Sequence, residues 1–155
     1  MKVLTLLFAS TFLFSISTFA QKVKIKKGIA TVNDVEYADM NECNGQTCTV
    51  MSLTGENILV MYWESFEKPN PIKRNPKSKS PYHETVTERY SIIKFFGSDI
   101  EFESKLLSKK QIVKALYKDN VIDADGSLSM SNVKIFTKKH ARDISSNRPT
   151  VIILK

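Results

Sequence analysis

The feature of the sequence that most constrains the fold is a change in hydrophobic periodicity near residue 108. Before this point, short segments alternate apolar and polar residues with the period of two that is typical of strands. After it, apolar residues recur at the three- and four-residue spacing of a helix face. Strands followed by helices indicate a class in which helices pack on an antiparallel sheet. The sequence therefore predicts one compact α+β domain: a meander-like antiparallel β-sheet of about six to eight strands, followed by two short helices.

Turn residues divide the first half of this domain into strands. Asn33-Asp34, between "IATV" and "VEYADM", predicts a two-residue hairpin turn, and Gly97-Ser98 predicts another tight turn. The apolar run over residues 58–63 lacks alternation, which predicts a central strand covered on both faces. At the other end of the chain, "PTVIILK" is β-prone and is expected to add a last strand.

The two expected helices begin at residues that favour helix capping. Ser108 and Gln111 have the spacing of a capping box, and Ser129 is the expected N-cap of the second helix. Between the helices, "DNVIDADGSLSMSN" resembles the middle of a calcium loop. In the register of such a loop, however, the first position is Val121 and the twelfth is Asn132, so two of the strongest oxygen ligands are missing. We therefore expect a helix–helix connector without a metal.

The first twenty residues predict export. An apolar run follows Lys2 and thins into Ser and Thr, and the small residues Thr18 and Ala20 suit a signal-peptidase site before Gln21. A transmembrane anchor is the alternative, because the run approaches the roughly 20 residues that span a bilayer. We expect a signal peptide over residues 1–20, a mature domain over 21–155 in the periplasm or secreted, and no transmembrane segment after cleavage.

Cys43 and Cys48 are the two cysteines of the chain. Export makes a disulfide the default interpretation, and Asn44-Gly45 is a turn sequence that would place the two thiols opposite each other in a hairpin. The spacing is not that of a Cys-x-x-Cys redox motif, and neither a histidine nor a second cysteine pair lies nearby to complete a zinc site. The sequence predicts a structural disulfide, and we expect neither a metal site nor a cofactor.

Residues 68–85, "KPNPIKRNPKSKSPYHET", hold four of the five prolines together with five basic residues. Because proline lacks a backbone donor and lysine resists burial, we expect a long exposed connection. The chain as a whole carries a net charge of +7, which suits a protein that works near anionic surfaces. Mobile cations beside an aromatic ring can bind phosphate or an acidic glycan. The candidate anion-binding residues are Lys73, Arg74, Lys77, Lys79 and Tyr82.

Catalytic motifs are scarce in this sequence. His83 and His140 are the two histidines, and no acid or nucleophile is tied to either by sequence spacing. A nucleophile elbow, a zinc-protease helix and a phosphate loop are all absent from the sequence. This favours an exported, non-catalytic binding or structural module. Its expected partner is an anionic polymer, a lipid headgroup or an acidic protein of the cell envelope, and not intracellular nucleic acid. The alternative is a small periplasmic enzyme whose site is assembled across the sheet.

Two segments, "KVKIKKGIATVNDVEY" and "IVKALYKDNVIDADGSLSMSNVKIFTKKH", resemble small exported bacterial proteins that have no assigned function. The resemblance covers both ends of the expected mature chain. It implies one exported domain and brings no catalytic motif with it.

Overall fold

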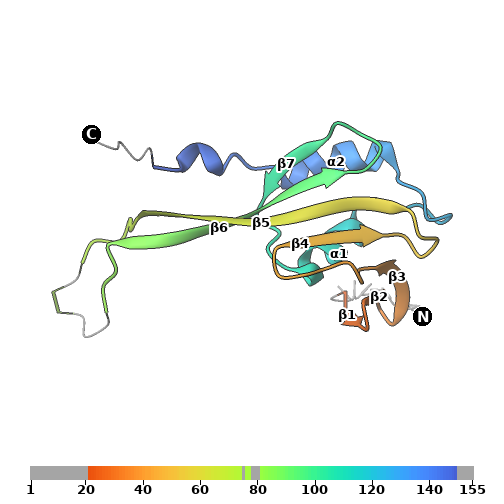
Figure 1. The fold of residues 1–155 in the computed structure, drawn as a ribbon, viewed down its shortest axis with the longest axis horizontal. Coiled ribbons are helices and arrows are strands. Elements are labelled where there is room, and N and C mark those ends of the chain that lie inside the picture. The colour runs from red at the N-terminus through yellow and green to blue at the C-terminus, as the bar shows by residue number, and fades with distance from the viewer. Residues whose placement is uncertain (1–20, 75, 78–80, 150–155) are drawn as a thin grey trace, which may run out of the picture.

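The structure is a computed structural model that describes residues 21–74, 76–77 and 81–149. Seven strands form one antiparallel sheet in which each strand pairs with its neighbour in sequence (Figure 1). The strands are β1 (Val23–Lys26), β2 (Ile29–Val32), β3 (Val35–Asp39), β4 (Thr47–Met51), β5 (Asn57–Pro69), β6 (Thr85–Phe95) and β7 (Glu101–Ser104). Helices α1 (Lys109–Lys118) and α2 (Met130–His140) follow, and then the short 3-10 helix η1 (Ser145–Asn147). The predicted α+β meander followed by two helices is confirmed. The expected signal peptide and, apart from Pro149, the expected last strand lie outside the described residues.

The first hairpins of the sheet follow from local turn chemistry. Asn33 and Asp34, between β2 and β3, have φ angles of 53° and 66°, as a type I′ turn requires of both central residues. Gly28, between β1 and β2, has a φ of 80°, and a Cβ added there would lie 1.7 Å from the Oδ1 atom of Asn41. Only glycine therefore fits this turn, where the chain returns so closely that the Met40 amide donates to the Gly28 carbonyl at 2.8 Å.

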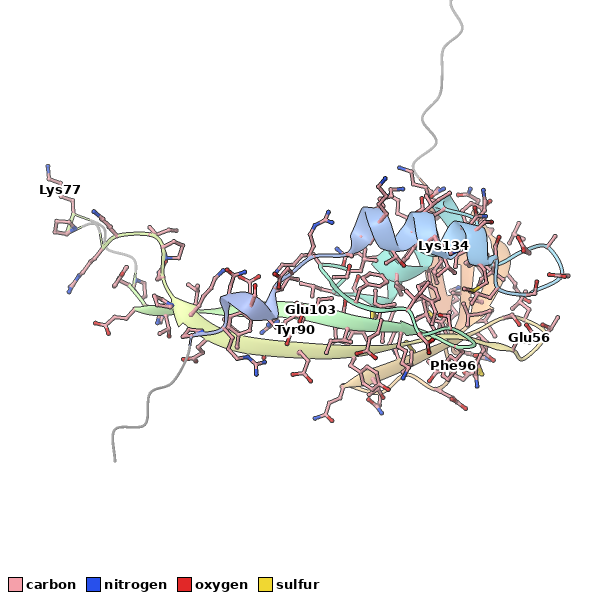
Figure 2. The ribbon with its side chains drawn as sticks, turned by 90° about the horizontal axis from the view of Figure 1, so that it is seen from above. Glu56, Lys77, Tyr90, Phe96, Glu103 and Lys134 are labelled. Carbon is pink, nitrogen blue, oxygen red and sulfur yellow. A yellow bond between two sulfur atoms is a disulfide. The ribbon has the colours of Figure 1, made fainter. Side chains whose placement is uncertain are left out.

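The two helices lie on the same side of the sheet, where they cover the main core (Figure 2). The rings of Phe95, on β6, and Phe136, on α2, meet edge to face with their centroids 5.7 Å apart. The fully buried side chains of this core include residues of the central strands and of one stripe of each helix: Val50, Leu59, Met61, Ile93, Phe95, Ile112, Leu116, Val133 and Phe136. The buried residues of α1 and α2 thus recur at the three- and four-residue spacing expected of a helix face.

Capping differs between the two helices. The Ser108 hydroxyl accepts a hydrogen bond from the Gln111 amide at 3.2 Å, and the Gln111 side chain accepts one from the amide of Leu107 at 2.8 Å. This is the expected capping box with its return bond shifted by one residue. Ser129 is the N-cap of α2 as expected, but its side chain makes no capping hydrogen bond within the described residues.

The prediction that residues 58–63 are covered on both faces is wrong for most of that run. Ile58 and Leu59 are both fully buried, but exposure alternates from Val60 onward and Tyr62 is exposed. Exposure alternates along this part of β5 because the helices cover only one face of the sheet. Ile58 has no opposite residue on β4, because the β4–β5 register shifts there in a β-bulge.

Strands β5 and β6 extend well past the rest of the sheet. Across the described residues, β4 pairs with β5 along residues 57–62, and β7 pairs with β6 along residues 91–94. Residues 64–69 and 85–90 therefore pair only with each other in the sheet, and we call this two-stranded ribbon the arm (Figure 1). At a rise of about 3.3 Å per residue, the arm extends roughly 20 Å from the sheet. Residues 70–84, at its end, are called the tip.

The expected exposed connection over residues 68–85 is thus too long at both ends, because Lys68, Pro69 and Thr85 belong to strands. Proline fits the end of β5 for a geometric reason. The Asn70 amide donates toward β6, to the Glu84 carbonyl, so the nitrogen of the preceding residue faces the open edge of β5. A missing N–H costs nothing at that edge, and Pro69 is tolerated there.

The C-terminal segment packs on the base of the arm, on the face opposite the main core. After α2, Ala141 forms a β-bridge with Ser104, and the chain then runs over β5 and β6 to η1 (Figure 1). Ile144 packs there with Phe66 and Tyr90 in a second, smaller hydrophobic cluster. This contact joins residues far apart in sequence, and nothing in the local pattern predicted it.

Within the described residues, no helix is long and apolar enough to cross a lipid bilayer.

Candidate anion-binding site at the arm tip

The tip begins and ends at a bonded pair of residues. The Asn70 amide donates to the Glu84 carbonyl at 2.8 Å, and its side-chain amide donates to the His83 carbonyl at 2.9 Å. The Oδ1 atom of Asn70 accepts a hydrogen bond from the Ile72 amide at 2.9 Å. A short asparagine side chain that binds the backbone two residues later is typical of a turn, and here it holds both ends of the tip on the arm.

A cavity of about 800 Å³ is formed by the tip and the end of the arm. Its lining includes Lys73, Arg74 and Tyr82, which are three of the five candidate residues predicted from the sequence. Lys77 lies outside this lining and points away from the body at the far end of the arm (Figure 2). Lys79 lies outside the described residues. The structure thus brings two cations and one aromatic ring around one concave surface.

The charges of the tip cavity are not balanced by ion pairs within the described part of the chain. Lys73 and Arg74 are exposed, and neither has an acidic partner there. Glu67, on the arm, lines the same cavity and accepts a hydrogen bond from the Thr85 hydroxyl at 3.4 Å. An uncompensated lysine and arginine beside one carboxylate give this surface a positive potential.

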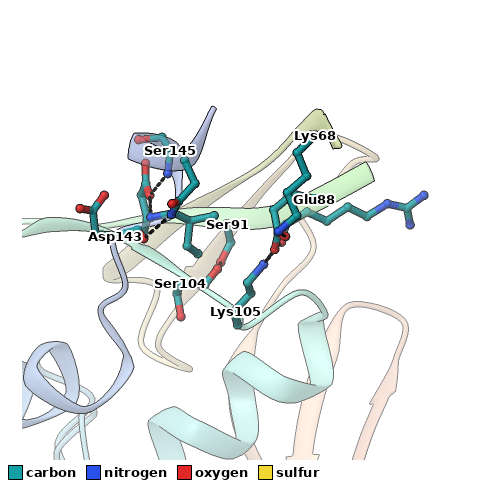
Figure 3. Close-up of polar contacts among 11 residues, drawn as sticks. Lys68, Glu88, Ser91, Ser104, Lys105, Asp143 and Ser145 are labelled. Carbon is teal, nitrogen blue, oxygen red and sulfur yellow. Dashed lines mark hydrogen bonds and ion pairs between the residues drawn. The ribbon is translucent and has the colours of Figure 1, made fainter. Parts of the chain in front are cut away.

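Lys68 was counted with the basic residues of the loop, but the structure gives it a different environment. It pairs with Glu88, and Lys105 pairs with the same carboxylate from the other side (Figure 3). The Lys105 ammonium also donates to the Arg89 carbonyl at 2.9 Å. Burial and the charge of Lys68 lower the pKa of Lys105. Lys68 therefore belongs to an ion-pair group on the arm, and the candidate site is confined to the tip.

One apolar side chain at the tip was missed by reasoning from the sequence. Ile72 lines the cavity and is 72% exposed, the largest exposed fraction among the large hydrophobic residues of the described chain. An isolated isoleucine between Pro71 and Lys73 was the available signal. Tyr82, on the segment of the tip that leads back to β6, is 39% exposed. The tip is therefore both basic and apolar.

The histidines have separate structural settings. His83 lines the tip cavity. The Nε2 atom of His140 lies 3.1 Å from the Oδ2 atom of Asp119, and Lys139 contacts the other oxygen of that carboxylate. Asp119 is the C-cap of α1, so this ion-pair group joins the C-terminal ends of the two helices. The pair could not be found from sequence because its members are 21 positions apart.

The predicted disulfide between Cys43 and Cys48 is confirmed. The turn that it closes is also held by hydrogen bonds, because the Asn44 side chain accepts from the amides of Gln46 and Thr47 at 2.8 and 2.7 Å. Cys48 is fully buried in the main core. Both observations indicate that the disulfide stabilises the turn that leads into β4.

The segment between α1 and α2 is a tight connector. Asp125 accepts hydrogen bonds from the amide and hydroxyl of Ser127, at 2.9 and 2.7 Å, and these bonds lower its pKa. Ile122 and Leu128 form a β-bridge that closes the segment. Among the residues that the structure describes, no group of three or more His, Cys, Asp or Glu side chains is placed to hold a metal ion.

A second cavity of about 630 Å³ lies where the arm leaves the sheet. Trp63 lines it, and its indole donates to the Leu107 carbonyl at 3.0 Å. The ring also packs against the main core, so Trp63 has a structural role and is not a free binding platform.

Comparison of the chain with protein-family models, with curated proteins and with solved structures finds no match in any of the three.

Proposed function

We propose that this protein is a non-catalytic module that binds anionic ligands through the tip of its arm. The observation that supports this most is the position of Lys73, Arg74 and Tyr82 around one cavity, at the end of a ribbon that extends beyond the sheet. Cations bind phosphate, carboxylate or sulfate oxygens, and an aromatic ring adds a flat apolar surface. Each of these side chains reaches solvent, so a large ligand has access to all three.

The length of the arm separates the charges of the tip from those of the body. Charges in water are screened over about 10 Å at 0.1 M salt, and the arm extends roughly twice that distance. Carboxylates on the body therefore weaken the potential at the tip very little. A ligand approaching the tip encounters a locally basic surface even though the whole chain contains 16 acidic residues.

The proposal also includes export of the protein. A signal peptide over residues 1–20 and a disulfide both suit a protein of the periplasm or the cell exterior. The ligand is then an anionic component of the cell envelope. The pairing of Lys68 with Glu88 further supports the tip as the binding element, because it neutralises the basic residue on the arm next to the tip and leaves Lys73 and Arg74 as the cations that line the tip cavity.

The test is binding to a fluorescent heparin oligosaccharide at increasing salt concentration. Replacing Lys73, Arg74, Lys77 and Lys79 with Gln should weaken binding by more than tenfold at low salt, and binding of the parent should fall steeply as salt rises. A matched control removes the same charge from exposed positions on the helices: Lys110, Lys114, Lys118 and Lys134. If the control variant loses as much affinity as the tip variant, binding reflects net charge alone and the proposal is wrong.

A further inference from the structure

We propose that the anionic ligand of the tip is the surface of a lipid bilayer, with Ile72 inserted among the headgroups. This inference rests on the proposed function and adds to it the kind of surface that is bound. The observation behind it is that the most exposed large hydrophobic side chain of the described residues lies beside Lys73 and Arg74 at the end of the arm.

Single exposed apolar residues are common on protein surfaces, so the exposure of Ile72 alone does not identify a binding site. The position of Ile72 is more informative, because its backbone is fixed. Its amide donates to Asn70, which is itself bonded to both Glu84 and His83. Pro71, between them, restricts the backbone further. The side chain is thus held in solvent at the tip and not buried against the arm.

The combination of side chains fits an interface between water and hydrocarbon. Lys73 and Arg74 can contact lipid phosphates, while Ile72 enters the apolar layer just below them. Tyr82, which lines the same cavity, has the apolar body and polar end that place tyrosine at bilayer interfaces. A soluble polyanion would engage the cations but offer no apolar phase to Ile72. A bilayer engages both, and we therefore favour it.

A comparable surface on the body lies on α2. Ile135 is 59% exposed and follows the exposed Lys134 (Figure 2 labels Lys134). The nearby Lys139, however, is paired with Asp119, so that surface is partly neutralised. The tip also projects beyond the body and can reach a membrane before the helices do. Ile135 is consequently a matched control for Ile72: the same residue type, similarly exposed, beside a lysine.

The experiment measures co-sedimentation with vesicles of phosphatidylcholine, with and without phosphatidylglycerol, alongside heparin binding. The parent should bind the anionic vesicles and bind neutral ones weakly, since each basic residue near an anionic surface strengthens binding by roughly fivefold. Ile72→Ser should weaken binding to anionic vesicles by about five- to tenfold, because the buried apolar area is lost. The same variant should bind heparin as the parent does. Ile135→Ser should change neither measurement.

A gain of affinity provides a second test. Ile72→Trp should tighten binding to anionic vesicles by at least several-fold without changing heparin binding, because tryptophan favours the bilayer interface. If Ile72→Ser and Ile72→Trp both bind anionic vesicles like the parent, the bilayer proposal is wrong, and retained heparin binding would leave the proposed function intact. If the parent binds heparin but no vesicles, a soluble polyanion is the ligand. If removing the charges of the tip changes binding to neither heparin nor anionic vesicles, the proposed function itself is wrong.

Discussion

At the residue scale, Glu103 links the C-terminal segment to the sheet. Its Oε2 atom accepts hydrogen bonds from the amides of Ile144 and Ser145, at 2.7 and 2.8 Å, as Figure 3 shows near Ser145. Burial alone would raise the pKa of Glu103. The hydrogen bonds from Ser145 and Ile144 and the positive charge of Arg148 outweigh burial and hold that pKa below its ordinary value of 4.5.

The lowered pKa predicts how the segment responds to acid. A carboxylate with a depressed folded-state pKa stabilises the structure above about pH 4.5, and this contribution is lost as the pH falls through the folded-state value. Glu103→Gln should therefore speed hydrogen exchange of the Ile144 and Ser145 amides near neutral pH. Glu101→Gln is the control, because Glu101 is exposed two residues earlier on the same strand. Equal effects of the two substitutions would show that Glu103 does not anchor the segment.

The disulfide makes a second prediction at this scale. The ring between Cys43 and Cys48 is short, so the chain-closure model gives it about 2 kcal/mol, out of roughly 5–15 kcal/mol for a typical domain. Because Asn44 already holds the turn, the Cys43→Ala, Cys48→Ala double variant should fold and lose about that amount. Urea unfolding, monitored by the fluorescence of the single tryptophan, Trp63, measures the loss. An unfolded double variant in dilute buffer would contradict this account.

At the scale of elements, the two helix starts should respond differently to the same substitution. Ser108 accepts a capping hydrogen bond and Ser129 does not, within the described residues. Ser108→Ala should lower the free energy of unfolding by about 1 kcal/mol, and Ser129→Ala by a few tenths at most. Urea titration of both variants tests this. Equal losses would mean that the Ser108 bond contributes nothing in solution.

The arm should unfold separately from the sheet. Phe66 packs with Tyr90 and Ile144, its ring centroid is 6.1 Å from that of Tyr90, and the Arg148 guanidinium lies 5.5 Å above it. Phe66→Ala removes the centre of this cluster, at a cost of about 2 kcal/mol for a residue at the edge of the molecule. Amides of the arm should then exchange roughly 30-fold faster, while Leu59 and Met61 on the same strand keep their protection. Uniform acceleration along β5 would show that the arm and sheet unfold as one unit.

Local chemistry explains which elements were predictable from the sequence. The Asn33-Asp34 turn, the N-cap at Ser108 and the short disulfide depend on residues within a few positions, and each was found. The arm depends on how far β5 and β6 continue past their neighbours, which no local pattern specifies. The contact of Glu103 with Ile144 joins residues 41 positions apart. At the site, charge and proline content located the tip, but only the structure showed Lys68 paired and Ile72 held in solvent.

At the scale of the whole molecule, stability and binding belong to different parts. The main core lies between the sheet and its two helices, whereas the candidate binding residues lie at the end of the arm (Figure 1). The tip contributes no side chain to either hydrophobic cluster of the described residues. Asn70 and Glu84 form a hydrogen-bonded pair, so a two-residue turn could join them without altering the register of the arm.

The most direct test of this separation is a variant in which residues 71–83 are replaced by Asn-Gly, with heparin binding and the melting temperature measured side by side. The account predicts that the variant folds with the circular dichroism spectrum of the parent and melts within a few degrees of it. Heparin binding should be abolished, because Lys73, Arg74, Lys77 and Lys79 are removed together. A variant that binds heparin as tightly as the parent would place the binding site on the body. A variant that no longer folds would show that the tip is part of the stable core.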